Sequence, residues 1–245
     1  MEKLQFDNNN FILYSPDSLK HVIKDLESTL KETLELYKKL FDVSDFRKVE
    51  IHYFDNKESF RNYVYELRGE KESLPKYAVG TGADGMIIAY IDPSIKEGTP
   101  IFRKRKCLAA HELFHIMYHE LIIFKTKQEH FTWFDEGCAQ FFSGEKDYEL
   151  NEGFEEWFSK VKEETKVIPK LNDLSHGEKF KTDDYNGYDL SLLAVKNLYD
   201  RFGYEYFKRT IANSINLLKN GDRIIDEAFL FYGIIYGKNN KTRKW

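Results

Sequence analysis

The stretch Leu108–Glu120, LAAHELFHIMYHE, decides how this chain is interpreted. It lies within a longer segment, from about Phe102 to Phe124, whose apolar residues recur at helical spacing and predict a helix. Residues 111–115, HELFH, have the form H-E-x-x-H. Because residues four apart lie on one face of a helix, His111 and His115 can direct their ring nitrogens at one metal ion.

Glu112 lies between these histidines but is rotated away from the metal axis, where its carboxylate can reach a metal-bound water. Three fixed letters also occur by chance, and the competing interpretation is a partly buried helix face rich in histidine. His119 extends the histidine stripe. It is too far along the helix to join the first two histidines at one ion, so we expect it to have a structural or supporting role.

A catalytic zinc ion takes three protein ligands and keeps a fourth position for water, so a third ligand is expected. The pattern H-E-x-x-H-x-x-G-x-x-H is excluded, because Tyr118 and Leu121 replace its glycine and last histidine. Glu136 is the candidate, since the 20 residues after His115 allow a helix end, a loop and a return. The competing interpretation of Glu136 is a first-turn glutamate favoured by the helix dipole. Gly137 is expected to leave space beside the ion.

The rest of the sequence predicts strands in the first half and helices in the second. The expected elements of the first half are a helix from Ser15-Pro16 to about Leu40, a strand over Lys48–Phe54, a helix over Lys57–Gly69, a flexible turn over Gly80–Gly85, and a strand over Met86–Asp92. Those of the second half are helices over about Trp133–Phe142, Glu152–Glu164, Tyr188–Phe202, Tyr204–Lys219 and Asp222–Tyr232, with a loop over residues 167–187. This is an α+β pattern. We expect one domain, residues 1–245, with a small mixed sheet and helices in a lobe of about residues 1–125, a mostly helical lobe of about residues 126–245, and the H-E-x-x-H helix between them.

The bulk properties exclude several classes of protein. A net charge of −4 makes a nucleic-acid partner unexpected, and no apolar segment approaches the roughly 18 residues of a membrane span. The first residues, MEKLQFDNNNFILYSPDS, do not resemble a signal peptide. Cys107 and Cys138 lie outside any C-x-x-C pair, and together these features predict a cytoplasmic protein, although a secretion signal could have been removed. The oligomeric state is not predictable.

The two metal motifs, H-E-x-x-H and W-x-x-E-G-x-A, resemble those of the gluzincin metallopeptidases, which include thermolysin and the aminopeptidase N relatives. The chain looks most similar to the small peptidase MA-like domains. Looser likeness in the segments KVEIHYFDNKESFRNYV (48–64), YDLSLLAVKNLYDRFGYEYFKRTI (188–211) and IIDEAFLFYG (224–233) extends the resemblance over about Lys48 to Trp245. It implies a zincin-like fold.

The resemblance also implies a role for each matching residue. His111, His115 and Glu136 would bind one Zn²⁺ per chain, and Glu112 would be the general base. Tyr188 would donate a hydrogen bond to the oxyanion.

Two tyrosines compete for the oxyanion role, because the loop could place the hydroxyl of Tyr185 there instead of that of Tyr188. Packing at the start of a helix is the competing role for Tyr188. The segment GMIIAYID (85–92) resembles the edge strand that pairs with an extended substrate in this group.

The sequence departs from the family pattern at two points. Thermolysin-like enzymes carry an aspartate four residues after the glutamate ligand, where it orients a ligand histidine, and here the residue is Gln140. An amide accepts a hydrogen bond from imidazole more weakly, which implies weaker zinc binding but not its loss. The exopeptidase motif G-x-M-E-N is absent, so aminopeptidase specificity is not predicted.

The predicted function is zinc-dependent hydrolysis of a peptide or protein substrate. The alternative is a catalytically silent zinc-binding module of the same fold, acting in protein binding or regulation. The intact Glu112 disfavours that alternative. The sequence does not distinguish a peptidase from a zinc hydrolase that cleaves non-peptide amides. It also does not distinguish an endopeptidase from an exopeptidase.

Overall fold

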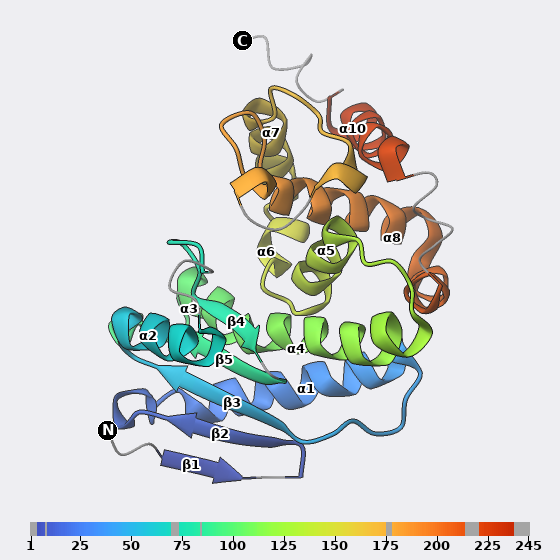
Figure 1. Ribbon diagram of the computed structural model, residues 1–245. Helices are drawn as coiled ribbons and strands as arrows, with labels where there is room; N and C mark the ends of the chain where they lie inside the picture. Colours follow the sequence, from blue (N-terminus) through green and yellow to red (C-terminus); the bar gives the residue numbers. More distant parts are fainter. Residues whose placement is uncertain are drawn as a thin grey trace. The chain divides into compact units, whose positions relative to one another are not determined.

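The computed structural model describes residues 4–7, 9–69, 74–83, 85–174, 178–213 and 221–237, which form an α+β protein. The chain divides into two compact units (Figure 1). The first comprises Met1–His119 with Phe142–Glu145, and the second comprises Glu120–Phe141 with Lys146–Trp245. None of the described helices is both long and apolar enough to cross a membrane.

The first unit is built on a mixed sheet of five strands in the order β1-β2-β3-β5-β4. The strands are β1 (Leu4–Asp7), β2 (Phe11–Ser15), β3 (Val49–Phe54), β4 (Gly80–Ala83) and β5 (Met86–Tyr90). The three central strands β2, β3 and β5 are parallel, and hairpins add β1 and β4 antiparallel at the two edges. Helices connect the parallel strands, because such strands require a long crossover.

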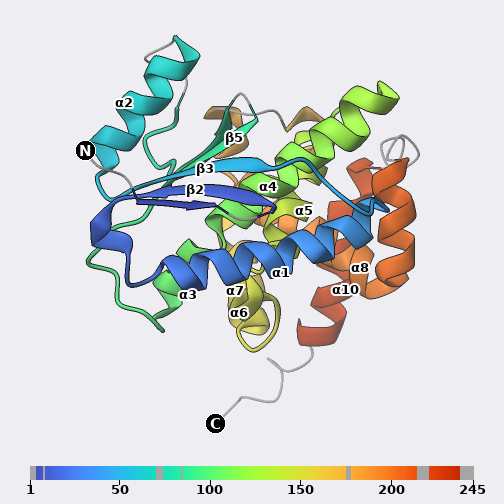
Figure 2. The ribbon, with the colours of Figure 1, turned by 90° about the horizontal axis from the view of Figure 1, so that it is seen from below.

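Helices cover both faces of this sheet (Figure 2). The helices of the unit are α1 (Ile23–Phe41), α2 (Lys57–Arg68), α3 (Pro100–Lys106) and α4 (Leu108–Tyr118). Alternation along β3 directs His52 and Phe54 toward Tyr63 of α2, with ring centroids 5.2 Å and 5.3 Å from that ring. Ile51 and Tyr53 are buried on the opposite face, which α1 and α4 cover.

The N-terminal segment differs from the sequence prediction. Ser15-Pro16 does not open a helix, because Ser15 is the buried last residue of β2. Pro16 precedes a single 3₁₀ turn over Asp17–Leu19, and α1 starts only at Ile23. The strands β1 and β2 were not predicted.

The predicted flexible turn over Gly80–Gly85 is also wrong, since Gly80–Ala83 forms β4 and pairs with β5. The strand Met86–Tyr90 is therefore internal, between β3 and β4, and is not the edge strand that the sequence suggested. Glycine removes the side chains by which a strand is normally recognised in a sequence, which explains why β4 was interpreted as a turn.

The predicted helix from Phe102 to Phe124 is interrupted twice. It breaks at Cys107, where α3 ends and α4 begins, and it widens into a π-helical turn over His119–Phe124. The H-E-x-x-H motif lies within the regular helix α4.

The described residues of the second unit form mainly helices and loops, as expected for the mostly helical lobe. Its α-helices are α5 (Thr132–Phe142, whose last residue belongs to the first unit), α6 (Asp147–Leu150), α7 (Phe154–Glu164), α8 (Gly187–Ala212) and α10 (Gly221–Gly237). The predicted break between two helices at Gly203 is confirmed, because Gly203 has φ 74° within α8. The end of the helix predicted to reach Lys219 lies outside the described residues.

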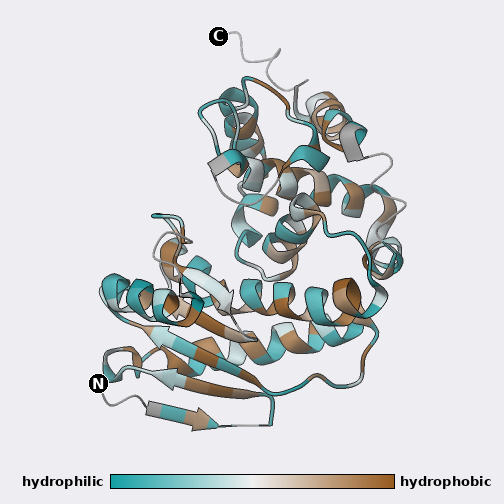
Figure 3. Cartoon of the chain, in the orientation of Figure 1, coloured by the Kyte–Doolittle hydropathy of each residue, from teal (hydrophilic) through white to brown (hydrophobic). Residues whose placement is uncertain are grey.

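Aromatic residues fill the core of the second unit. Phe134 stacks on Phe207 with ring centroids 6.1 Å apart, and Phe154 lies 4.8 Å from Tyr232. Trp133 and Phe207 are completely buried. Figure 3 shows hydrophobic and hydrophilic residues alternating in short bands along the helices, a pattern typical of helices with one buried face. Aromatic residues make up 16% of the sequence, and core packing uses many of them.

Candidate metal centre

Helix α4 presents the H-E-x-x-H motif on one side and packs its other side into the first unit. Leu113, Phe114 and Met117 are completely buried. The ring of Phe114 lies 5.4 Å from that of Tyr37, and the Tyr37 hydroxyl donates a hydrogen bond to the carbonyl of Ala110 at 3.1 Å. These contacts fix the rotation of α4 and therefore the direction in which its histidines point.

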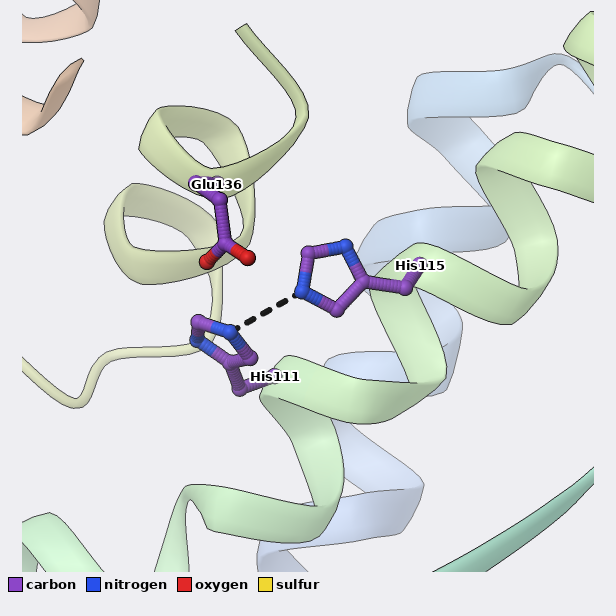
Figure 4. A group of neighbouring side chains, drawn as sticks. All are labelled: His111, His115 and Glu136. Carbon is purple, nitrogen blue, oxygen red and sulfur yellow. Dashed lines mark hydrogen bonds between the residues drawn. The ribbon is translucent and has the colours of Figure 1, made fainter. Parts of the chain in front are cut away.

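The two histidines of the motif converge, as Figure 4 shows. The Nε2 atoms of His111 and His115 lie 3.0 Å apart, with the rings inclined at 73°. Two nitrogens bound to one tetrahedral zinc ion at 2.0–2.1 Å would be about 3.3 Å apart. The pair therefore has nearly the spacing that a shared ion requires.

Glu136 supplies the carboxylate of the group. It lies in α5 and is only 6% exposed. The three side chains come together (Figure 4). Each of His111, His115 and Glu136 offers one ligand atom, and these atoms lie within 4.8 Å of one another. Two imidazoles and a carboxylate form the donor set of a catalytic zinc site with an open fourth position, so these residues fit the metal that the sequence implied.

Glu145 is a residue that the sequence analysis missed. Its Oε2 atom lies 3.5 Å from Nδ1 of His111, and each side chain is 11% exposed. This separation is longer than an ordinary hydrogen bond, so Glu145 is placed to orient the imidazole by electrostatic attraction if Nε2 binds a metal. No motif marks the position, which follows the end of α5 and the turn at Gly144, where φ is 79°.

Gln140, where the resemblance led us to look for such a carboxylate, makes different contacts. Its amide nitrogen donates to the backbone carbonyls of Glu136 at 3.2 Å and Tyr188 at 3.1 Å. Gln140 thus fastens α5 to the first turn of α8. It is only 2% exposed, so its two hydrogen bonds are sheltered from water.

Glu112 lies over β4, where glycines make room for it. A Cβ atom added at Gly80 would lie 3.1 Å from Glu112 Oε1, and one added at Gly82 would lie 3.9 Å from Oε2. The added Cβ at Gly80 would also lie 2.8 Å from Leu108 Cδ1. The close approach of α4 to β4 thus depends on glycine at position 80.

Gly137 does not have the role that the sequence suggested. A Cβ atom there would lie 2.5 Å from the carbonyl oxygen of Ser191 and 2.7 Å from Val195 Cγ2, both in α8. Gly137 therefore allows α5 and α8 to pack closely, and it does not keep space beside an ion.

Tyr188 lies in the first turn of α8, and its backbone N–H donates to the Asn186 side chain at 3.2 Å. Its ring meets Phe180 edge-on with centroids 4.6 Å apart. The hydroxyl of the rival Tyr185 donates to the carbonyl of Lys179 at 2.8 Å. The Tyr185 hydroxyl is thus engaged within its own loop, and the contact with Phe180 fits the competing packing role of Tyr188.

Cys107 and Cys138 are both buried and form no disulfide. Burial, together with the nearby carboxylate of Asp135, raises the pKa of the Cys138 thiol well above its usual value. Cys138 is therefore a packing residue of α5 and a poor candidate for a nucleophile.

No protein-family model matches the sequence, and a search of curated proteins finds no match.

Proposed function

We propose that this protein is a zinc-dependent metallopeptidase of the gluzincin type with a zincin-like fold. The observation that carries the proposal is the convergence of ligand atoms from His111, His115 and Glu136 within 4.8 Å, with Glu112 next to the first ligand. A buried histidine-rich helix face, the competing interpretation, does not account for a carboxylate meeting both imidazoles.

A zinc ion bound by these three residues would lower the pKa of its water to about 7 and polarise the carbonyl that is attacked. Glu112 is the residue that we assign to proton transfer. It would accept the proton of the attacking water and deliver it to the amine that leaves. Its place over Gly80 and Gly82 keeps the carboxylate at the surface of β4.

Tyr188 is our candidate for the hydrogen bond to the oxyanion. Its backbone carbonyl accepts from the same Gln140 amide that binds the carbonyl of Glu136. Gln140 would therefore act as a positioning residue, because it keeps the start of α8 in register with the turn of α5 that carries the glutamate.

We propose that an extended peptide pairs with β4. This strand lies at the edge of the described sheet. The carbonyl of Val79, the residue before β4, accepts a hydrogen bond from the backbone N–H of Tyr90 in β5. Because backbone groups alternate in direction along a strand, those of Gly80 face away from β5. The next outward carbonyl, that of Gly82, accepts from Arg68 Nη2 at 3.0 Å. The backbone of Gly80, beside Glu112, is thus the position at which we expect substrate to pair.

The second candidate function is a zinc-binding module that does not cleave. It would use the same three ligands to stabilise a surface for another protein. The carboxylate of Glu112 disfavours it, because a module without catalysis has no need of a proton acceptor between its two histidine ligands.

The test is cleavage of a reduced and alkylated unfolded protein, with new amino termini identified by mass spectrometry. We expect cleavage by the zinc-loaded protein, loss of cleavage after removal of zinc with a chelator, and recovery when zinc is returned. Zinc binding without cleavage of such a substrate would contradict the peptidase and support the silent module.

A further inference from the structure

A second group of potential metal ligands lies outside the proposed zinc site. His119, His130 and Asp135 each offer one ligand atom, and these atoms lie within 4.8 Å of one another. The group shares no residue with His111, His115 and Glu136. We expected His119 to have a structural or supporting role, and the sequence assigned no role to His130.

Local structure accounts for the position of each donor. His119 is the first residue of the π-helical turn that ends α4, and π-helical insertions are frequent at functional sites. His130 lies in the loop before α5, and Asp135 lies in the first turn of that helix. The backbone N–H of Asp135 bonds to the carbonyl of Phe131 at 3.1 Å, which fixes the carboxylate beside the loop.

Within the group, a buried carboxylate meets a more accessible imidazole. His130 Nε2 lies 2.8 Å from Asp135 Oδ2, and the side chain of Asp135 is 1% exposed whereas that of His130 is 25% exposed. A carboxylate buried this deeply requires a hydrogen-bond donor or a cation. His119 brings a second imidazole into the same group, which provides the three donor atoms that a metal ion needs.

We propose that His119, His130 and Asp135 bind a second divalent transition-metal ion, with zinc as the expected occupant. Two imidazoles and one carboxylate suit zinc and neighbouring metals, whereas calcium and magnesium prefer oxygen ligands. The partial exposure of His130 gives the ion a path to solvent, so this ion exchanges more readily than one in a closed site. The proposal does not depend on peptidase activity.

The test is the number of zinc ions bound per chain. Untagged protein is stripped with a chelator, dialysed, titrated with zinc alone and measured by calorimetry and by native mass spectrometry. We expect two zinc ions for the wild type, one for His130→Gln and one for Glu136→Ala. The exposed His21 provides a control, because His21→Gln should still bind two.

The main test uses His130→Gln. Because Asp135 is buried, its change to asparagine can disturb folding, so Asp135→Asn is used only if its circular dichroism spectrum matches that of the wild type. One zinc in both the wild type and His130→Gln would overturn the second site. Two ions in His130→Gln would also overturn it, because the second ion would then lie elsewhere. One zinc in the wild type that is lost in His130→Gln but kept in Glu136→Ala would support this site and contradict the proposed catalytic site.

Discussion

The Oε2 atom of Glu145 lies 3.5 Å from Nδ1 of His111. His111 directs its other ring nitrogen, Nε2, at Nε2 of His115. A carboxylate on the far side of a metal-binding imidazole fixes the ring orientation and makes the ligand nitrogen more basic. We therefore propose that Glu145 positions His111 at the proposed zinc site, a role that the resemblance led us to expect at position 140, where this sequence has glutamine.

Glu145→Gln should weaken zinc binding by about 10- to 100-fold, because the amide orients the imidazole less strongly. Competition with a chromophoric chelator measures the dissociation constant. Glu164→Gln provides the control, because Glu164 is 53% exposed and forms an ion pair with Lys160 on its own helix. The zinc affinity of this variant should equal that of the wild type. Equal affinity in Glu145→Gln would show that the carboxylate does not support His111.

Gly80→Ala should slow catalysis without loss of zinc. The new methyl group would lie 2.8 Å from Leu108 Cδ1 and 3.1 Å from Glu112 Oε1, so it would displace the proposed base. A shift of this kind costs about 10- to 100-fold in rate. Gly82→Ala is the matched control on the same strand, since its methyl group meets nothing closer than 3.6 Å. Peptide hydrolysis and zinc content are measured on the same samples. Identical rates for the two variants would show that contact with β4 does not position Glu112.

Gly137→Ala should destabilise the protein by about 1–3 kcal/mol, because the methyl group would overlap the Ser191 carbonyl of α8. The free energy of unfolding in urea measures the effect. Gly233→Ala in α10 is a control of opposite sign, since a methyl group there meets no atom within 4 Å. It should add about 0.5–1 kcal/mol, because alanine favours a helix. A Gly137→Ala variant as stable as the wild type would contradict the close packing of α5 on α8.

Cys138 should resist alkylation in the folded protein. The thiolate is the reactive form, and a raised pKa leaves less thiolate at pH 8 than an ordinary cysteine has. Mass spectrometry after iodoacetamide treatment should show Cys138 modified in urea but not in native buffer. Rapid labelling of the native protein would mean that α5 opens or that the thiol is accessible.

The proposed zinc site was predictable from sequence to the extent that it depends on local geometry. The spacing of His111 and His115 needs only a helix, and the motif around Glu136 added the third residue. The contact of Glu145 with His111 depends instead on the path of the chain after α5, which no short-range pattern encodes. The second donor group was missed for the same reason, because it joins a helix end, a loop and a helix start.

The fold was predictable where side-chain patterns are strong. The apolar runs of β3, α1 and α7 mark these elements within a few residues of their ends, except for the start of α1. Strand β4 was missed because GTGA carries almost no side-chain signal, and its glycines are explained only by Leu108 and Glu112 above them. Strands β1 and β2 pair antiparallel in the N-terminal segment, where the sequence did not lead us to expect a strand.

The most direct test of the central claim is the rate of peptide-bond hydrolysis by Glu112→Gln, measured with zinc content on the same samples. Glutamine keeps the size of the side chain but does not accept the proton of the attacking water. We predict wild-type zinc content with hydrolysis reduced by about 10²- to 10⁴-fold, the usual contribution of a general base. A zinc-loaded Glu112→Gln variant that cleaves as fast as the wild type would show that Glu112 is not the general base.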